Sequence, residues 1–412
     1  MNILFVHEVD WLDKPVFDVH FLAEGLSLRG HRVYAIDYED SWKRSSFFDF
    51  GSLKTKEFSG VSRAFPVASV EVRRPGFIKI PGLSRISAFV THYLEIQKTI
   101  REKAIDAIVL YSVPTNGLQT ISLARKFNIP VLFRSIDILN RLVPYRPLRP
   151  VTKRMEKRVY SSVDAVLPNT PQYLKYVLGT GVAESKVRLL PFPLDTGLFR
   201  PGVDGSEVRQ KWGLKEGEPV VVFIGTLFDF SGLDEFIGHF PSVIKEIPGA
   251  KLLIVGDGIL RPKLERIIAD QGLQGRVIIT GFQPYRTMPQ YINLASVCIN
   301  PFLVTEANMD IFPAKMMQYV ACGKATVATS LRGISTILPG ESHGVVYAAS
   351  PAEMVPEVIA LLKSPERRQR LGEAGLNQVR GKYSYEKIAQ ELETILGEAI
   401  KEKRYDTASK RT

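Results

Sequence analysis

Four glycines in the second half of the chain each follow an apolar run or open a helical pattern. Gly225 ends "VVVFIG" and Gly256 ends "LLIVG", while Gly232 and Gly258 lie just before the next helical pattern. Where a strand turns into a helix, glycine lets backbone N–H groups approach a phosphate, and the helix N-terminus favours negative charge. The pattern indicates a phosphate-bearing ligand, although glycines at strand ends are common in any parallel α/β protein.

The more specific phosphate and metal motifs do not occur in this sequence. Neither glycine stretch has the G-x-G-x-x-G pattern after the first strand, or the Gly-Lys-Ser/Thr ending of a P-loop. The sequence therefore gives little support to an interpretation as a dehydrogenase or a P-loop kinase. No Cys/His cluster has zinc spacing. We expect neither a metal nor an organic cofactor.

The sequence predicts strands that alternate with helices, and these elements would position the glycines. In the first half "NILFV" and "HRVYAID" are predicted strands, and apolar residues recur between them at helical spacing up to Gly30. Further predicted strands there are "AIVLYS", "PVLFRSID", "DAVLPNT" and "KVRLLPF". Such alternation predicts a parallel sheet with helices on both faces.

A second strand–helix series begins after residues 196–218, which are rich in Gly, Pro and charge and are interpreted as a linker. Its predicted strands are "PVVVFIG", "AKLLIVG", "RVIITGF", "SVCINPF", "ATVATS" and "GVVYA", and three amphipathic helices follow. We predict an α/β protein with two Rossmann-like, doubly wound domains, residues 1–195 and 219–384, that face each other across a cleft. Ligands of such sheets bind at the carboxyl ends of the strands.

Composition is that of a folded protein in a reducing compartment. The chain has 412 residues, of which 45% are hydrophobic and 24% charged. Its two cysteines, Cys298 and Cys322, argue against a disulfide scaffold. No apolar run approaches the roughly 18–20 residues that span a bilayer, and "MNILFVHEVDW" is interpreted as a first strand rather than a signal peptide. We therefore expect a cytoplasmic protein.

Taken together, the segments of the second half resemble retaining nucleotide-sugar glycosyltransferases of family 4, which have the two-domain GT-B fold. The resemblance rests on "FIGTLFDFSGLDEFI", "LLIVGDGILRPKLE", "VIITGFQPYRTMPQYINLASVCINPF", "PAKMMQYVACGKATVAT" and "RGISTILPGESHGVVY", in the order of that family. The first half matches more loosely, through "MNILFV", "LAEGLSLRGHRVYAI" and "DAVLPNTPQYLKYVL". The resemblance covers nearly the whole chain and implies that the helix at 385–403 packs back on the N-terminal domain.

The family has two glutamates separated by seven residues, of which the first reaches the transferred sugar and the second holds the ribose hydroxyls. Here Asp310 stands at the first position and Gln318 at the second. An amide can accept and donate hydrogen bonds, but it lacks the charge-assisted strength of a carboxylate. The alternative is that Gln318 is a polar residue at a helix end without a ligand.

Two cations that the family uses against the donor diphosphate are replaced by Thr226 and Ser231. Because charge accumulates on the leaving diphosphate, fixed positive groups there stabilise the transition state. Lys315 lies near the helix face of Gln318, and Lys324 follows shortly after, so both are candidate replacements. For Lys324 a solvated turn residue is the alternative. The expected donor-binding residues are Gly225, Thr226, Ser231, Gly256, Gly258, Phe282, Lys315 and Gln318.

The N-terminal domain departs from the family as well. The Gly-Gly acceptor loop of the family corresponds to Pro15-Val16, beside Lys14. The sugar-contacting histidine of the family is replaced by Ile136, while the aspartate after it is retained as Asp137. We expect Asp137 and Asp310 to act at the reaction centre. The expected acceptor-side residues are Lys14, His20, Arg134 and Ser135, although a lone histidine such as His20 is more often structural.

Positive charge is concentrated in the N-terminal half. Residues 1–190 hold 28 Lys and Arg against 18 Asp and Glu, out of a net charge of +11 for the chain. The stretch from Arg141 to Tyr160 has seven basic residues and one acidic residue. Such a surface attracts anionic membranes, nucleic acid or an anionic substrate, or is simply solvated. No nucleic-acid motif supports the second of these. We expect weak association with an anionic membrane at the inner face through Arg146, Arg149, Lys153 and Arg154.

The resemblance implies a hexosyltransferase-type enzyme (EC 2.4) that moves a sugar from a nucleoside diphosphate to a glycan or lipid-linked acceptor with retention. Asp310 would position the sugar, and a phosphate oxygen would act as base. No Asp-x-Asp occurs, so a metal-bridged diphosphate is not expected. Cell-envelope or exopolysaccharide biosynthesis is the expected setting. The alternative is a catalytically weak GT-B protein that binds a nucleotide sugar or a partner without turnover.

Overall fold

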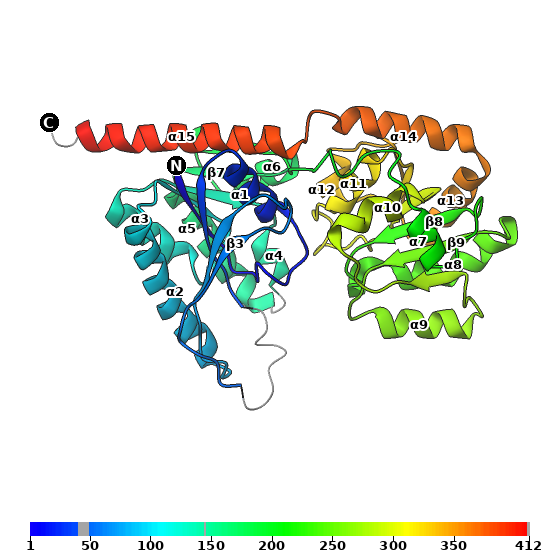
Figure 1. The fold of residues 1–412 in the computed structure, drawn as a ribbon, viewed down its shortest axis with the longest axis horizontal. Coiled ribbons are helices and arrows are strands. Elements are labelled where there is room, and N and C mark those ends of the chain that lie inside the picture. Colours follow the sequence, from blue (N-terminus) through cyan, green and yellow to red (C-terminus); the bar gives the residue numbers. More distant parts are fainter. Residues whose placement is uncertain (40–48, 144–145, 410–412) are drawn as a thin grey trace. The chain divides into compact units, whose positions relative to one another are not determined.

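The computed structural model describes residues 1–39, 49–143 and 146–409, which form two compact units (Figure 1). The first unit comprises residues 1–193 and the segment from Tyr385 onward, and the second comprises Leu194–Ser384. Residues 196–218, expected as a linker, belong to the second unit. They contribute Phe199, Val208 and Leu214 to its core.

The first unit is built on a seven-stranded sheet in the order β3-β4-β2-β1-β5-β6-β7. Its strands pair in parallel except β3, which is antiparallel to β4. The strands are β1 (Asn2–Val6), β2 (Arg32–Ile36), β3 (Lys56–Val61), β4 (Val70–Arg74), β5 (Ala107–Leu110), β6 (Val131–Ser135) and β7 (Ala165–Pro168). The prediction for "KVRLLPF" was wrong, because that stretch makes only the isolated bridge between Val187 and Val166.

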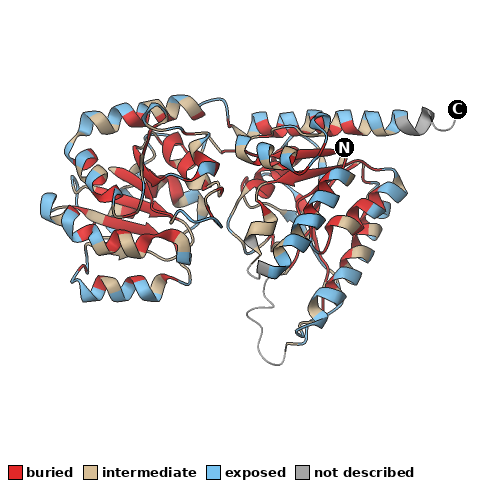
Figure 2. Ribbon diagram, turned by 180° about the vertical axis from the view of Figure 1, so that it is seen from behind, coloured by how far each residue is buried: buried red, intermediate tan, exposed pale blue. Residues whose placement is uncertain are grey.

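Helices cover both faces of this sheet, as a doubly wound fold requires. They are α1 (Asp18–Leu28), α2 (Leu83–Glu102), α3 (Gly117–Phe127), α4 (Leu139–Leu142), α5 (Arg149–Ser162), α6 (Pro171–Gly179) and α15 (Tyr385–Ser409). Ile3 and Phe5 pack in one core with α1 and α15, while Leu4 and Val6 pack in another with α2, α3 and α5. This period-2 alternation leaves the sheet buried between its helices (Figure 2). The expected return of the C-terminal helix to the N-terminal domain is confirmed, since α15 packs on α1.

The second unit has a six-stranded parallel sheet in the order β10-β9-β8-β11-β12-β13, and all six expected strands are present. They are β8 (Val220–Ile224), β9 (Lys251–Val255), β10 (Val277–Ile279), β11 (Val297–Asn300), β12 (Thr326–Thr329) and β13 (Val345–Ala348). The helices are α7 (Ser206–Lys211), α8 (Leu233–Glu246), α9 (Arg261–Asp270), α10 (Met288–Asn293), α11 (Ala314–Ala321), α12 (Arg332–Ser335), α13 (Met354–Lys363) and α14 (Pro365–Val379).

Strand order in the second unit reverses between β8 and β11. From β8 the chain adds β9 and β10 on one side, and from β11 it adds β12 and β13 on the other. At such a reversal the loops leaving the two central strands diverge, so ligands of open parallel sheets bind at the carboxyl ends of those strands. In this unit the two ends are Gly225 after β8 and Pro301 after β11.

Candidate nucleotide-sugar site

The predicted glycines lie at the carboxyl edge of the second sheet, where backbones approach closely. A Cβ on Gly256 would lie 1.9 Å from the carbonyl oxygen of Gly225, so no larger residue fits there. Gly225 has φ +142°, and a Cβ on it would lie 2.7 Å from the Lys315 amine. Gly256 also forms an isolated bridge with Gly281, which places Phe282 at the same edge with an exposed ring. The chain is therefore packed tightly around this edge of the sheet, and the backbone N–H of Gly225 already donates a hydrogen bond of 2.9 Å to the carbonyl oxygen of Val255.

Lys315, in the first turn of α11, reaches this edge. Its amine lies 4.1 Å from the ring centroid of Phe223 on β8 and 4.3 Å from that of Phe302 after β11. These two rings come from the two sides of the strand-order reversal. The side chain is half-buried and has no carboxylate partner among the described residues. Burial lowers the pKa of Lys315 to about 7.

The helix that carries Lys315 is fastened to the sheet one turn further on. The Ile224 backbone N–H donates a hydrogen bond of 2.8 Å to the hydroxyl of Tyr319, which is fully buried. Gln318 precedes it, half-buried, and its side chain lies beside the hydroxyl of Tyr285. Burial raises the pKa of Tyr285 well above its usual value, so this hydroxyl stays neutral. Lys315 and Gln318 thus reach the site from one anchored helix.

Asp310 lies just before α11 and is 4% exposed. The guanidinium of Arg332, at the start of α12, pairs with both of its oxygens, with Nε at 3.1 Å from Oδ1 and Nη2 at 3.3 Å from Oδ2. A side-on pair of this kind fixes the plane of the carboxylate. Arg332 was not predicted from the sequence, because its surroundings in "SLRGIS" carry no signal for this contact.

Two buried polar side chains at the same edge lack partners among the described residues. The Ser231 hydroxyl is fully buried, and so are both polar atoms of the Asn300 amide, and none of them makes a hydrogen bond within the described chain. Unpaired buried polar groups are rare in folded proteins and often mark a site for a ligand or water. Asn300 was not predicted as a site residue, although it is a polar residue that ends the apolar run "SVCIN". Thr226 is half-buried.

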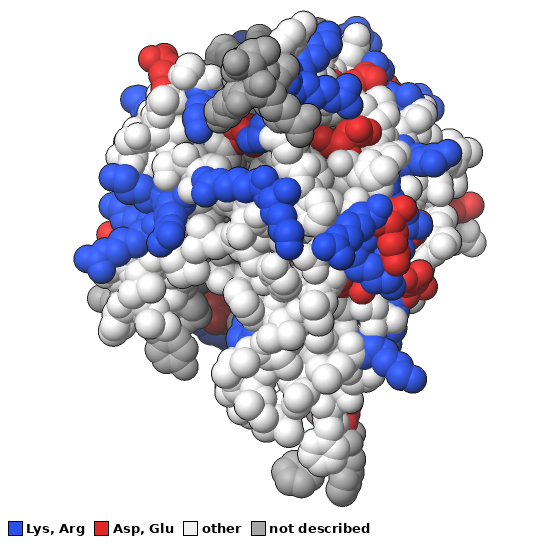
Figure 3. Space-filling view, turned by 90° about the vertical axis from the view of Figure 1, so that its left-hand side faces the viewer, with Lys and Arg blue, Asp and Glu red and all other residues white. Residues whose placement is uncertain are grey.

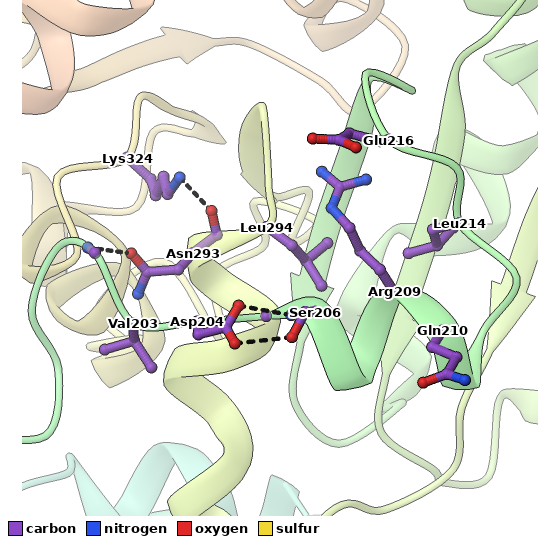
Figure 4. A pocket seen from close by; sticks show the side chains of 12 residues that line it. Val203, Asp204, Ser206, Arg209, Gln210, Leu214, Glu216, Asn293, Leu294 and Lys324 are labelled. Carbon is purple, nitrogen blue, oxygen red and sulfur yellow. Dashed lines mark hydrogen bonds between the residues drawn. The ribbon is translucent and has the colours of Figure 1, made fainter.

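Lys324 does not belong to this site, which corrects one of the two candidate replacements. It follows the C-terminal end of α11 and precedes β12, so it lies at the opposite edge of the sheet from Lys315. Its amine donates a hydrogen bond of 2.6 Å to the carbonyl oxygen of Asn293. There it borders a cavity of about 760 Å³ whose lining also includes Asp204 and Arg209 (Figure 4).

In the first unit, three of the expected acceptor-side residues are buried structural residues. The Arg134 guanidinium pairs with Asp18 at 2.5 Å and also donates to the carbonyl oxygens of Leu167 and Leu190. His20 is fully buried between the carbonyl oxygen of Trp11 and the backbone of Phe17.

Ser135 is 1% exposed and lies 3.5 Å from the hydroxyl of Tyr160. We therefore withdraw Arg134, His20 and Ser135 as acceptor contacts, because their polar groups already have partners inside the fold. Lys14 is half-buried.

Asp137 differs from these residues because it has no hydrogen bond within the described chain. It follows β6 at the carboxyl edge of the first sheet and is half-buried. Burial and the negative charge of Asp18 together raise the pKa of Asp137 to about 7. A carboxyl group whose pKa is raised by burial and by a neighbouring carboxylate is typical of a functional site.

The basic segment expected to face a membrane is only partly described. Lys153 and Arg154 are exposed on α5, while Arg149 is half-buried and donates to the carbonyl oxygen of Val143. The side chain of Arg146 lies outside the described residues. None of the described helices combines the length and apolar character needed to cross a bilayer. Within the same residues no group of three His, Cys, Asp or Glu side chains is arranged to hold a metal.

Comparison with solved structures identifies the fold. The chain superposes on sucrose-phosphate synthase of Thermosynechococcus elongatus with a TM-score of 0.74, over 97% of this chain and 99% of that one, at 18% identity. It superposes on HepE of Anabaena, solved in complex with UDP, with a TM-score of 0.71, over 97% and 100% of the two chains, at 16% identity. At these identities the likeness shows the GT-B fold alone.

Sequence comparison identifies the family. Residues 18–193 match the glycosyl transferase 4-like domain, and residues 218–364 match the glycosyl transferases group 1 model. The protein therefore belongs to the group 1, GT4-like family of glycosyltransferases.

Two curated relatives illustrate how far this likeness extends. The chain is 28% identical to alpha-D-kanosaminyltransferase of Streptomyces kanamyceticus, over 47% of this chain and 49% of that protein. It is 30% identical to a GDP-mannose-dependent monoacylated alpha-(1-6)-phosphatidylinositol monomannoside mannosyltransferase of Corynebacterium glutamicum, over 50% and 55%. The chain thus spans about half the length of these curated relatives.

Proposed function

We propose that this protein transfers a sugar from a nucleoside-diphosphate sugar to an acceptor, with retention at the anomeric carbon and without a metal ion. The observation that carries the proposal is the edge of the second sheet. At this edge Asp310 and Gln318, to which the resemblance assigns the sugar and the ribose, are joined by Lys315, a half-buried lysine without a carboxylate partner among the described residues. Family membership and the name of HepE in complex with UDP support a nucleotide donor.

In this proposal the site residues of the second unit have separate roles. Asp310, held in plane by Arg332, hydrogen-bonds the hydroxyls of the transferred sugar and positions it. Gln318 holds the ribose through neutral hydrogen bonds. The acceptor hydroxyl attacks the face from which the diphosphate leaves, and a phosphate oxygen accepts its proton. The buried Ser231 hydroxyl and Asn300 amide, which have no hydrogen-bond partner within the described chain, stabilise the charge that develops on the leaving group.

The acceptor is assigned to the first unit, with Asp137 as the proposed contact. A carboxyl group that is half-protonated near pH 7 can accept or donate a hydrogen bond to a sugar hydroxyl. We propose a glycan or lipid-linked acceptor in cell-envelope or exopolysaccharide biosynthesis. The names of the mannosyltransferase relatives, which act on phosphatidylinositol mannosides, support an acceptor with a lipid portion.

Weak association of the first unit with an anionic membrane is part of the same proposal. The outer side of the first turns of α2 carries large apolar side chains that are between 48% and 64% exposed, namely Leu83, Ile86, Phe89, Val90 and Leu94. In the view onto the first unit from the side of α2 and α3, the lower lobe is almost free of charged side chains, and Lys and Arg lie above it (Figure 3). An exposed apolar helix face beneath basic side chains suits an anionic lipid surface.

Nucleotide release tests the transfer. The protein is incubated with UDP-, GDP-, ADP- and TDP-sugars, with and without a lipid extract as acceptor source, and the released nucleoside diphosphate is measured. We expect release from at least one donor, and a loss of about 100-fold or more in Asp310→Asn, because the neutral amide cannot hold the sugar hydroxyls as strongly. Asp270→Asn, an exposed aspartate at the end of α9, is the matched control.

The alternative function, a GT-B protein that binds without turnover, gives a different result. In that case the wild-type protein binds a donor in calorimetry, yet nucleotide release does not exceed that of Asp310→Asn. The missing family cations at Thr226 and Ser231 are the observation that favours this alternative.

A further inference from the structure

The donor edge of the second unit carries little fixed positive charge for a ligand with two phosphates. Thr226 and Ser231 are neutral, and the charge of Arg332 is already committed to Asp310. Arg261, which follows β9, pairs with Asp257 at 2.7 Å and with Glu265 at 2.7 Å. Among the described residues around this edge, Lys315 is the cation that lacks an acidic partner.

The position of Lys315 suits an amine that receives an anionic ligand at the edge of the sheet. Its contacts with Phe223 and Phe302 put it at the strand-order reversal, directly against Gly225. Helix α11, which carries Lys315, is held against the sheet by the hydrogen bond from the Ile224 backbone N–H of β8 to the Tyr319 hydroxyl. The unpaired Ser231 hydroxyl and Asn300 amide offer further neutral donors at the same edge.

Building on the proposed function, we propose that Lys315 is the cation that binds the donor diphosphate in this protein, and that its amine takes up one proton from solvent as the diphosphate binds. The proton comes from buffer acid, so a neutral amine and an anionic ligand become an ammonium–diphosphate pair. The two aromatic faces hold the ammonium in place, since a cation is attracted to the face of an aromatic ring.

The surroundings of Lys315 explain why its amine is easily neutralised before the ligand arrives. The elements packed directly against it offer two aromatic rings and a glycine, which supply no compensating negative charge. The titratable groups on neighbouring segments are the buried hydroxyl of Tyr319, the exposed Asp229, and Asp257 and Asp310 in their ion pairs. None of them bonds to the Lys315 amine, so burial dominates and lowers its pKa to about 7.

The sign of the pH dependence follows from this linkage. A bound diphosphate favours the charged amine, so the pKa of Lys315 is higher in the complex than in the free protein. Below the free value both states are protonated and the affinity is constant. As the pH rises above about 7, only the complex keeps the proton, and the affinity falls by up to about tenfold per pH unit.

Calorimetric titration of the protein with a nucleotide sugar tests the inference. UDP-glucose and GDP-mannose are suitable probes, because the phosphates of these diesters do not titrate between pH 6 and 8.5. Heats measured in two buffers of different ionisation enthalpy give the number of protons taken up. We expect proton uptake that is small at pH 6, increases as the pH rises, and approaches one proton per ligand above pH 8.

Two variants separate Lys315 from other sources of proton uptake. In Lys315→Met the uptake disappears, the dissociation constant at pH 6.5 rises at least about tenfold, and the dependence on pH flattens. Lys324→Met is the matched control, because Lys324 is also a partly buried lysine whose pKa is lowered by burial, but it lies at the opposite edge. It should bind the donor with unchanged affinity and proton uptake.

The outcomes distinguish this inference from the function on which it rests. If the wild-type protein binds a nucleotide sugar without taking up a proton, and with the same affinity at pH 6.5 and 8, the inference is overturned and the proposed function stands. The same holds if Lys315→Met binds as tightly as wild type. Should no nucleotide sugar bind the wild-type protein at any pH, both proposals fail. The wild-type measurement decides the matter even if Lys315→Met does not fold.

Discussion

At the scale of single residues, the proposed donor site has an unusual charge pattern, which comes from Gln318, Asp310 and Lys315. The carboxylate of Asp310 is already paired, the ribose position is an amide, and the lysine has no acidic partner. Before a ligand binds, the site therefore holds little charge of either sign that is not already paired. Such a site loses some binding strength per hydrogen bond, but it also avoids holding unpaired buried charges, which are costly.

Restoring the family carboxylate tests this pattern. Gln318→Glu should tighten donor binding about fivefold, because a charged acceptor adds about 1 kcal/mol over a neutral one in a hydrogen bond to a ribose hydroxyl. Gln318→Ala should weaken it by a similar factor. Dissociation constants at pH 6.5 provide the measurement. Unchanged affinity in both variants would show that Gln318 does not touch the ribose.

At the scale of elements, two helices do most of the positioning. Helix α11 brings Lys315 and Gln318 to the edge of the second sheet and is held there through Tyr319. Helix α15 completes the first unit by covering the sheet face that α1 leaves open, with Ile388, Leu392 and Leu396 almost fully buried. A segment after Ser384 is thus as much a part of the first core as β1 is.

Truncating one side chain of α15 should therefore weaken the first unit selectively. Leu392→Ala is expected to lower its free energy of unfolding by about 2–5 kcal/mol, because it leaves a cavity where Leu392 is fully buried. Hydrogen exchange read by mass spectrometry resolves the two units. Peptides of β1 should lose protection while those of β8 keep it. Leu361→Ala in α13, equally buried in the second unit, should give the reverse pattern.

At the scale of the whole molecule, charge and apolar surface are unevenly distributed. Residues 1–190 hold most of the net positive charge, and the exposed apolar face of α2 belongs to the same unit. In the proposed membrane association, the charge would supply an attraction to anionic lipid that salt screens, and the apolar face would supply insertion. We expect either one alone to give only weak binding.

Vesicle co-sedimentation tests this combination. Wild-type protein should bind vesicles with anionic lipid more strongly than neutral ones, and less at high salt. In the double variant Ile86→Glu, Val90→Glu binding should fall at least about tenfold, because two apolar side chains no longer leave water. Ile259→Glu, an exposed apolar residue of the second unit, is the control.

Two results would contradict the lipid assignment. One is binding that does not depend on anionic lipid. The other is a dimer in solution that the double variant dissolves, since it would assign the α2 face to a second copy of the chain.

More of the architecture than of the candidate site could be predicted from the sequence. Buried parallel strands leave continuous apolar runs, and for this reason all six strands of the second unit were predictable. Strand β3 was not, because "KEFSGV" is largely exposed and lacks alternation. The burial of Arg134 depends on Asp18 and on carbonyl groups distant in sequence, which no local pattern reveals. Likewise, only the fold separates Lys315 from Lys324, because one helix places them at opposite edges of one sheet.

The place of α15 in the chain has a consequence for synthesis. The sheet of the first unit leaves the ribosome long before the helix that covers one of its faces, because residues 194–384 come between them. At about 5–20 residues per second, roughly 10–40 s pass in which Ile3 and Phe5 lack part of their cover. The second unit can complete its core during this interval. The first unit can therefore complete its core only after α15 has emerged, and we expect nascent chains to expose the apolar face of its sheet until then.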